Sequence, residues 1–372
     1  MTKPQSPHPP ADPVLASLNG GRGAMENPAG RFEPLTLEAD TDAAEAELAD
    51  PDDMFAPTPI RTEVFYDRTK SIISTNDSPD IGMDATVNPY RGCEHGCIYC
   101  FARPTHEYLG LSAGLDFETK IFAKPDAPRL LAEKLSSKNW QPAVIFMSGV
   151  TDPYQPLERK LKITRGCIEV LADFHNPVSF ITKNALIARD IDLLSPMASL
   201  NLTSVNFSVT TLDRKLARAM EPRATTPLLR LKAIEQLAKA GIPVTVLIGP
   251  VLPGLTEHEI PAILKSAADA GAVSAGYTML RLPYGVKDLF QTWLHEHFPD
   301  RADKVLNRIR AIRDGKLNDA EFGARMRGEG FYAEQIAQIF TLARRRFNLT
   351  RRITLSTAHF RRDAHSRQFS LF

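Results

Sequence analysis

The chain has 372 residues, of which 43% are hydrophobic and 24% are charged, and its formal net charge is +1. This composition is typical of a globular protein with one large or two average domains, and four cysteines are too few for a disulfide scaffold. No apolar run approaches the ~20 residues that span a bilayer, and the N-terminus lacks the apolar region of a secretory signal, so we expect a cytoplasmic protein without a membrane segment.

The first 60 residues are expected to form a disordered tail that is acidic and rich in proline. The first 55 residues hold 11 acidic side chains against three basic ones, and ten of the 28 prolines precede residue 60. Such a segment cannot bury enough apolar surface to offset the entropy of ordering its backbone. We therefore expect the folded core to begin at residue 61.

Between residues 61 and 285, short runs of β-branched residues alternate with segments of helical periodicity. The predicted strands are 85–90, 144–148, 178–182, 204–210, 244–248 and 274–281, and the predicted helices are 128–135, 161–174, 186–194, 214–220, 227–240 and 259–270. Repeated strand–helix units predict an α/β fold with a parallel sheet and outer helices. Six units are fewer than the eight of a closed TIM barrel, so we expect a partial (β/α)6 TIM-like barrel.

The pattern becomes purely helical after residue 285. We expect a helical C-terminal extension over residues 286–347, with helices at 302–314, 319–327 and 333–347. The remaining residues, 348–372, are expected to form a basic tail. Between residues 341 and 372 there are eight arginines against a single acidic residue, Asp363.

A cluster of three cysteines follows the first predicted strand. Cys93, Cys97 and Cys100 lie within eight residues on a glycine-containing loop. Thiolates bind iron or zinc, and three cysteines can hold three irons of a 4Fe–4S cluster while the fourth iron stays open to another ligand. The alternatives are a zinc site with His95 as the fourth ligand, or reduced thiols that bind no metal.

The spacing Cys-x3-Cys-x2-Cys, with Tyr99 before the last cysteine, resembles the radical S-adenosylmethionine superfamily. The longer string from Asn88 to Cys100 is similar to the branch that contains spore photoproduct lyase and uncharacterised bacterial relatives. The resemblance implies a 4Fe–4S cluster on the three cysteines and S-adenosylmethionine on the open iron. It implies that S-adenosylmethionine is cleaved reductively to a 5′-deoxyadenosyl radical, which abstracts hydrogen from a substrate. It also implies an electron donor such as flavodoxin or ferredoxin, and it implies that Tyr99 packs on the adenine. Tyr99 could instead be a core aromatic.

Further candidates for binding S-adenosylmethionine lie where the later strands end, because ligands of parallel barrels bind at the carboxyl ends of the strands. The resemblance implies roles for Lys183 and Arg223 at the methionyl carboxylate and for Ser208 at the ribose or carboxylate, and it places Glu257 beside the adenine. Loop 148–156 resembles the family's loop that binds the methionyl amino group, although it lacks the usual Gly-Gly-Glu sequence. Three of these assignments have a structural alternative: a proline-driven turn for loop 148–156, a solvated Lys183 and a helix cap at Glu257. The candidates are Ser148, Thr151, Lys183, Ser208, Arg223 and Glu257.

The comparison with spore photoproduct lyase leaves the hydrogen donor open. In that enzyme a cysteine just after the second strand closes the radical cycle, but residues 147–151 here contain no thiol. The remaining cysteine, Cys167, has the spacing of a buried helix face and is expected to be structural.

The C-terminus suggests a nucleic-acid context. The arginine-rich segment would attract phosphates, although a solvated helical face also explains it. The last five residues, Gln368–Phe372, resemble the peptide by which bacterial proteins bind the DNA sliding clamp. The favoured function is therefore a radical enzyme with a nucleic-acid substrate. The alternatives are the same chemistry on a small molecule or protein, or a non-catalytic iron–sulfur module that senses redox state.

Overall fold

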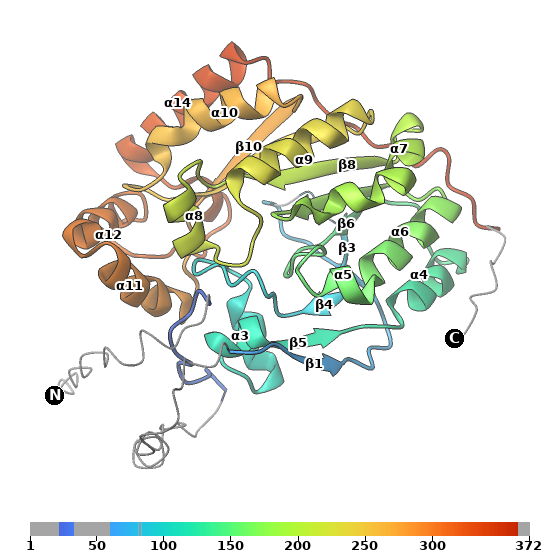
Figure 1. Cartoon of the computed structure of the whole chain (residues 1–372), viewed down its shortest axis with the longest axis horizontal. Coiled ribbons are helices and arrows are strands. Elements are labelled where there is room, and N and C mark those ends of the chain that lie inside the picture. The colour runs from blue at the N-terminus through green and yellow to red at the C-terminus, as the bar shows by residue number, and fades with distance from the viewer. Residues whose placement is uncertain (1–21, 33–59, 81, 83, 364–372) are drawn as a thin grey trace, which may run out of the picture.

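The computed structural model describes residues 22–32, 60–80, 82 and 84–363 (Figure 1). Most of the predicted N-terminal tail and the predicted clamp-binding peptide Gln368–Phe372 lie outside these residues. Within the described residues, no helix is both long and apolar enough to cross a lipid bilayer.

The main sheet contains seven strands in the order β10-β9-β8-β7-β6-β3-β2. Within this sheet, β3, β6, β7, β8, β9 and β10 pair in parallel, and β2 closes one end as an antiparallel strand. The six parallel strands follow one another in chain order, which confirms the predicted partial (β/α)6 barrel. The strands are β2 (Ile73–Thr75), β3 (Ala85–Val87), β6 (Ile145–Met147), β7 (Val178–Thr182), β8 (Thr203–Ser208), β9 (Val244–Val251) and β10 (Ser274–Met279).

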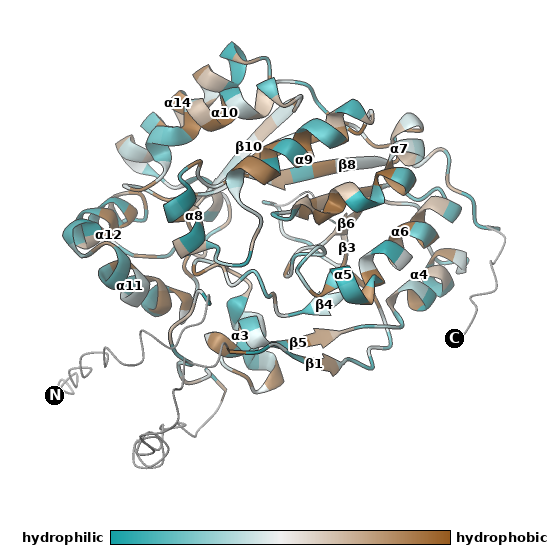
Figure 2. Cartoon of the chain, in the orientation of Figure 1, coloured by the Kyte–Doolittle hydropathy of each residue, from teal (hydrophilic) through white to brown (hydrophobic). Residues whose placement is uncertain are grey.

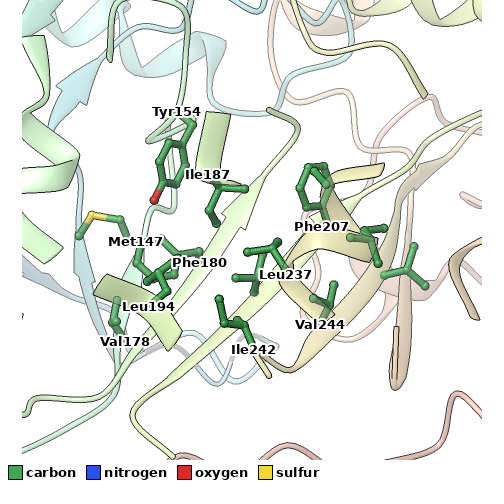
Figure 3. Packing of buried hydrophobic residues seen from close by; sticks show 14 of the residues in the cluster. Met147, Tyr154, Val178, Phe180, Ile187, Leu194, Phe207, Leu237, Ile242 and Val244 are labelled. Carbon is green, nitrogen blue, oxygen red and sulfur yellow. The ribbon is translucent and has the colours of Figure 1, made fainter. Parts of the chain in front are cut away.

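Helices cover the outside of this sheet with their apolar faces turned inward (Figure 2). Figure 3 shows side chains from the strands, among them Phe180 and Phe207, packed against helix residues such as Leu194 and Leu237, all completely buried. The predicted helix 186–194 differs from the structure, because residues Ala185–Asp190 form a 3₁₀-helix before the α-helix begins. The α-helices are α4 (Ala127–Ser136), α5 (Glu158–Leu161), α6 (Ile163–Asp173), α7 (Ile191–Ser199), α8 (Arg214–Met220), α9 (Pro227–Lys239) and α10 (Ile260–Asp269).

A second, three-stranded sheet was not predicted. It has the order β1-β5-β4 and lies beside a short helix, α3 (Figure 1). The strand predicted over 85–90 is in fact divided between the two sheets, because Pro89 has no N–H for a ladder and separates β3 from β4. The elements are β1 (Glu63–Tyr66), β4 (Tyr90–Arg91), α3 (Leu115–Thr119) and β5 (Lys120–Ala123).

The C-terminal extension is helical as predicted, and its last helix packs against α10. The helix predicted over 319–327 begins only at Ala324, because Gly323 before it has a φ of +82°, outside the helical region. The extension contains α11 (Val286–His297), α12 (Ala302–Ala311), α13 (Ala324–Arg327) and α14 (Gly330–Arg346).

Residues 22–32 correct the prediction of a tail that is disordered up to residue 60. The backbone N–H groups of Gly23 and Ala24 donate to the carboxylate of Glu118, at 2.8 and 2.7 Å. Arg22 donates to the carbonyl of Glu118 at 2.8 Å. Gly23 has no room for a side chain, since a Cβ would lie 1.7 Å from the carbonyl oxygen of Gly96. This segment is therefore part of the folded core and lies against the cysteine loop.

Residues 349–363, which we call the C-terminal strap, cross the barrel at the amino ends of its strands. The backbone N–H groups of Arg351, Ser356 and Arg361 donate to carbonyls just before β10, β8 and β7, at 3.1, 2.9 and 2.8 Å. The strap occupies the first part of the predicted basic tail. Arg362 is not free for a ligand, because its guanidinium donates to the carbonyls of Ser137 and Trp140.

Candidate functional site

The three predicted metal-binding cysteines lie on one loop after β4, and all three are free thiols. Cys93 and Cys97 are buried, and Cys100 is partly buried. Backbone hydrogen bonds fold the loop on itself: the N–H of Gly96 donates to the carbonyl of Cys93 at 3.3 Å, and the N–H of Cys100 to that of Cys97 at 3.1 Å. Burial raises the pKa of each thiol above its usual value. The three sulfur atoms are therefore shielded thiols rather than exposed thiolates.

A buried arginine fixes the shape of this loop. Arg103 is completely buried and donates to the carbonyls of Cys97 and Gly96 at 3.0 and 3.2 Å. It also pairs with Glu118 at 2.5 Å. Gly96 has a φ of +64°, and a Cβ there would lie 2.4 Å from the Glu118 carboxylate. Arg103, Glu118 and the N-terminal segment thus clamp the loop from behind, and sequence reasoning did not identify them.

Tyr99 belongs to a buried polar network that the sequence did not predict. Its hydroxyl donates to the carboxylate of Glu221 and lies 3.3 Å from Oγ1 of Thr210. Glu221 also accepts hydrogen bonds from Arg230 and, at 2.8 Å, from Thr210. Although burial disfavours its charged form, the Arg230 guanidinium and the Lys183 ammonium hold the pKa of Glu221 at about 2. A charged Glu221 therefore anchors the edge of the Tyr99 ring.

Lys183 lies over the other side of Tyr99. Its Nζ is 5.9 Å from the centre of the ring and donates to the carbonyl of Gly249 on β9 at 3.1 Å. Ser208, the last residue of β8, is buried, and its carbonyl accepts a hydrogen bond from Arg230 at 3.1 Å. Tyr99, Lys183 and Ser208 therefore belong to one region between the cysteine loop and the carboxyl ends of β7 to β9.

The loop after β6, residues 148–156, is hydrogen-bonded to the cysteine loop. The hydroxyl of Thr151 donates to the carbonyl of Gly92 at 2.6 Å, and the hydroxyl of Ser148 donates to the carbonyl of Thr151. The N–H groups of Gly149 and Val150 both donate to Oδ1 of Asn88, at 3.0 and 3.1 Å. In the structure, the two predicted hydroxyls thus make contacts that hold this loop beside the cysteines.

Asp152 joins the two loops to β7. Its carboxylate accepts hydrogen bonds from the hydroxyl of Thr182 and the N–H of Lys183, both at 2.8 Å. It also lies 3.4 Å from Nδ1 of His95, whose Nε2 is 3.1 Å from the amide nitrogen of Asn184. Burial opposes ionisation of Asp152, but His95 and these donors hold its pKa below the ordinary value.

These contacts give the zinc alternative no support, because both ring nitrogens of His95 face other partners. Among the residues that the structure describes, no three His, Cys, Asp or Glu side chains come close enough together to bind a single metal ion. Three free thiols on one apolar-lined loop fit a 4Fe–4S cluster, which takes one cysteine per iron and leaves the fourth iron open.

Two predicted cosubstrate residues make structural ion pairs. Arg223 pairs with Glu94 of the cysteine loop at 3.2 Å. Glu257 caps the turn at Gly254, at 2.8 Å, and binds Arg308 and Tyr332 of the C-terminal extension, at 2.5 and 2.6 Å. The structure thus directs Glu257 to the helical extension rather than to the Tyr99–Lys183 region.

Cys167 lies in α6 and is completely buried, as its helical spacing predicts. Burial raises the pKa of its thiol, and the charge of Glu158 adds to that effect.

Comparison with known proteins agrees with this site. The model of the radical SAM superfamily matches residues 87–267. An uncharacterised protein of Mycobacterium tuberculosis is 36% identical over 217 residues, which are 58% of this chain and 64% of that protein. The radical SAM Nalpha-GlyT isomerase of Pseudomonas phage M6 is 25% identical over 179 residues, 46% of this chain and 34% of that protein. The match therefore spans less than two thirds of each of these two relatives.

The fold is also similar to solved structures. Spore photoproduct lyase complexed with dinucleoside spore photoproduct aligns with a TM-score of 0.51 and 14% sequence identity, over 76% of this chain and 78% of that one. Members of the radical SAM superfamily use a 4Fe–4S cluster and S-adenosylmethionine, and the three free thiols Cys93, Cys97 and Cys100 lie within the matched residues. The cysteine loop and the parallel strands from β6 to β9 lie within the matched residues, so residues 87–267 of this chain are similar to the radical S-adenosylmethionine superfamily.

Proposed function

We propose that this chain is a radical S-adenosylmethionine enzyme of the spore photoproduct lyase-like branch, and that its substrate is a nucleic acid. The single observation that carries the enzymatic assignment is the loop of three free thiols, two buried and one partly buried, next to the Tyr99–Lys183 region. When bound, a 4Fe–4S cluster supplies the electron that cleaves S-adenosylmethionine to a 5′-deoxyadenosyl radical, which takes a hydrogen atom from the substrate.

The chain's own residues bind, orient and exclude water. The ammonium of Lys183 provides a positive charge for the methionyl carboxylate, and Tyr99 provides a ring held in place by Glu221. Ser208 is available at the end of β8, and Ser148 and Thr151 hold the adjacent loop against the cysteine loop. Arg223 keeps the cysteine loop in place through Glu94. The apolar packing of the loop keeps water from the reacting atoms.

The nucleic-acid substrate is supported by the shared fold with a lyase whose structure contains a dinucleoside photoproduct. The arginine-rich C-terminus, of which Arg345, Arg351, Arg352 and Arg361 are exposed, supplies a positively charged surface for phosphates away from the cysteine loop. We also propose two partners: an electron donor such as flavodoxin or ferredoxin, and a DNA sliding clamp that binds Gln368–Phe372. We propose a reducing cytoplasmic location because the four cysteines are free thiols.

The test is turnover with the anaerobically reconstituted, dithionite-reduced protein. 5′-Deoxyadenosine is measured by chromatography with single-stranded DNA, ultraviolet-irradiated DNA, RNA or no addition. We expect 5′-deoxyadenosine without addition and a severalfold higher rate with at least one nucleic acid. Formation of 5′-deoxyadenosine that no nucleic acid stimulates would contradict the substrate assignment and favour a small molecule or protein.

The second candidate function is a non-catalytic iron–sulfur module that senses redox state. The completely buried Glu94–His95 stretch favours it, because so many contacts of the cysteine loop are to protein rather than open to a ligand. This alternative predicts a bound cluster but no 5′-deoxyadenosine under any of the conditions above.

A further inference from the structure

Arg281 lies just beyond the carboxyl end of β10 and has almost no hydrogen-bond partners. Its one hydrogen bond within the described residues is a long contact from Nη1 to the sulfur of Met326, at 3.6 Å. Its Nε is buried and has no partner there. A guanidinium carries five N–H donors, so most donors of this partly buried side chain have no protein acceptor among the described residues.

Two other arginines with a buried Nε differ from Arg281 because their remaining nitrogens have oxygen acceptors. Arg22 and Arg313 also have a buried Nε without a partner in the described part of the chain, but their remaining nitrogens reach oxygen atoms. Arg22 donates to the carbonyl of Glu118 and Arg313 to that of Leu280, both at 2.8 Å. Both are thus satisfied as structural residues, whereas Arg281 donates to no oxygen that the structure describes.

The electrostatic surroundings of Arg281 favour an added anion. Burial lowers its pKa, and the neighbouring charge of Arg325 lowers it further. The charge of Asp80 opposes this effect, but Asp80 is already engaged by Arg325 at 2.5 Å and accepts the N–H of Gly323 at 2.6 Å. A bound anion would supply both the missing acceptors and the missing negative charge.

An exposed aromatic ring lies next to this guanidinium. The ring centre of Phe101 is 5.3 Å from Cζ of Arg281, and the side chain is 46% exposed. Phe101 directly follows Cys100, so the pair lies at the rim of the metal site. A second arginine lies against an exposed ring close along the chain: Cζ of Arg31 is 3.7 Å from the ring centre of Tyr284, although Nε of Arg31 already donates to the Glu107 carboxylate at 2.5 Å. Figure 1 shows the N-terminal segment of Arg31 beside α3 and α11.

Arginines interleaved with exposed aromatic rings are the pattern by which proteins bind single-stranded nucleic acids, the guanidinium on the phosphate and the ring on the base. We propose that Arg281 binds a backbone phosphate of the substrate and that Phe101 stacks on an adjacent base, which positions that nucleotide at the radical site. This inference rests on the proposed nucleic-acid substrate and identifies the residues that hold it.

The test measures binding of a fluorescent single-stranded oligonucleotide to the reconstituted protein by anisotropy, at several salt concentrations. Arg281→Gln should weaken binding about 5- to 10-fold, and the slope of log K against log salt should fall by about 0.7, the value for one lost phosphate contact on a single strand. Phe101→Ala should weaken binding about tenfold without changing the slope, because stacking releases no counterions. Arg159→Gln, an exposed arginine on α5, is the matched control and should bind like the unaltered protein.

Arg281→Lys keeps the charge and guards against misfolding of the glutamine variant. It should retain the salt slope of the unaltered protein while binding two- to threefold more weakly, because it loses the planar guanidinium. Equal affinity and slope for Arg281→Gln and Arg159→Gln would overturn this inference and leave the nucleic-acid substrate standing. Absence of oligonucleotide binding by the unaltered protein would overturn both.

Discussion

Glu221 holds the buried polar network beside the cysteine loop. It accepts hydrogen bonds from Tyr99, Thr210 and Arg230, and all four side chains are buried. The sequence shows Glu221 only as the start of a turn, and its partner Arg230 looks like any helix residue. Such a pairing cannot be read from sequence because it depends on how α8 and α9 pack.

We expect Glu221→Gln to lower the free energy of unfolding by about 3–5 kcal/mol, since it leaves Arg230 buried without an anionic partner. Denaturant unfolding at neutral pH measures this loss. Glu235→Gln removes an exposed ion pair with Lys239 on α9 and should cause no measurable change. Equal stability of the two variants would show that the Glu221–Arg230 pair does not support the fold.

The same residue makes stability depend on pH in the acidic range. The pKa of Glu221 in the folded state is about 2, below the ordinary value of 4.5. Its stabilising contribution is therefore complete above pH ~4.5 and is lost as the pH falls towards 2, a change of about 3 kcal/mol. We expect the unaltered protein to lose more stability than Glu221→Gln between about pH 5 and 2. Parallel curves for the two proteins would contradict this assignment.

At the scale of elements, two loops and one segment determine the shape of the site. Asp152 connects the loop after β6 with His95 of the cysteine loop and with the end of β7.

We expect Asp152→Asn to lower the iron bound per chain and to shorten the lifetime of the cluster in air severalfold, because the two loops lose their charged connection. Asp173→Asn, exposed at the end of α6, is the control. Iron content and the cluster's visible absorbance measure the effect, and matching decay of the two variants would refute it.

The N-terminal segment shows that average composition does not reveal a short ordered stretch within an acidic, proline-rich region. An average over 55 residues reports an acidic tail, yet residues 22–32 are held by two backbone N–H groups on Glu118 and by the side chains of Arg22, Asn27 and Arg31. Backbone donors leave no side-chain signal in a sequence, and three separate polar side chains form no pattern that reveals their distant partners. By contrast, the six barrel strands could be predicted, since each is a β-branched run followed by a helical period, and Cys93, Cys97 and Cys100 could be found from their spacing alone.

Gly23→Ala should detach this segment, because its Cβ would collide with the carbonyl of Gly96. Limited trypsin digestion measures the result, and we expect faster cleavage at Arg22 and Arg31. Gly82→Ala, where a Cβ would meet no atom within 4 Å, is the matched control. Unchanged cleavage in Gly23→Ala would mean that the segment does not depend on this contact.

At the scale of the whole molecule, the cysteine loop and the C-terminal strap lie at opposite ends of the barrel. The cysteines follow the carboxyl end of the first barrel strand, whereas the strap contacts residues just before β7, β8 and β10. A partner that binds the C-terminus would therefore leave the mouth of the barrel accessible.

Deletion of residues 364–372 should accordingly abolish capture by an immobilised bacterial sliding clamp and leave 5′-deoxyadenosine formation within twofold of the full chain. A pull-down and the turnover assay measure the two properties on the same preparations. Clamp capture that survives the deletion would refute the role of Gln368–Phe372, and loss of turnover would refute the separation of the two ends.

The most direct test of the whole account is 5′-deoxyadenosine formation by the anaerobically reconstituted, reduced protein and by Cys97→Ser prepared in parallel. Cys167→Ser, which alters the buried thiol of α6, is the control. We predict that the full chain and Cys167→Ser bind iron and sulfide and form 5′-deoxyadenosine from S-adenosylmethionine, and that Cys97→Ser does neither. A bound cluster without 5′-deoxyadenosine, or equal turnover by Cys97→Ser, would contradict the assignment of this loop as the radical site.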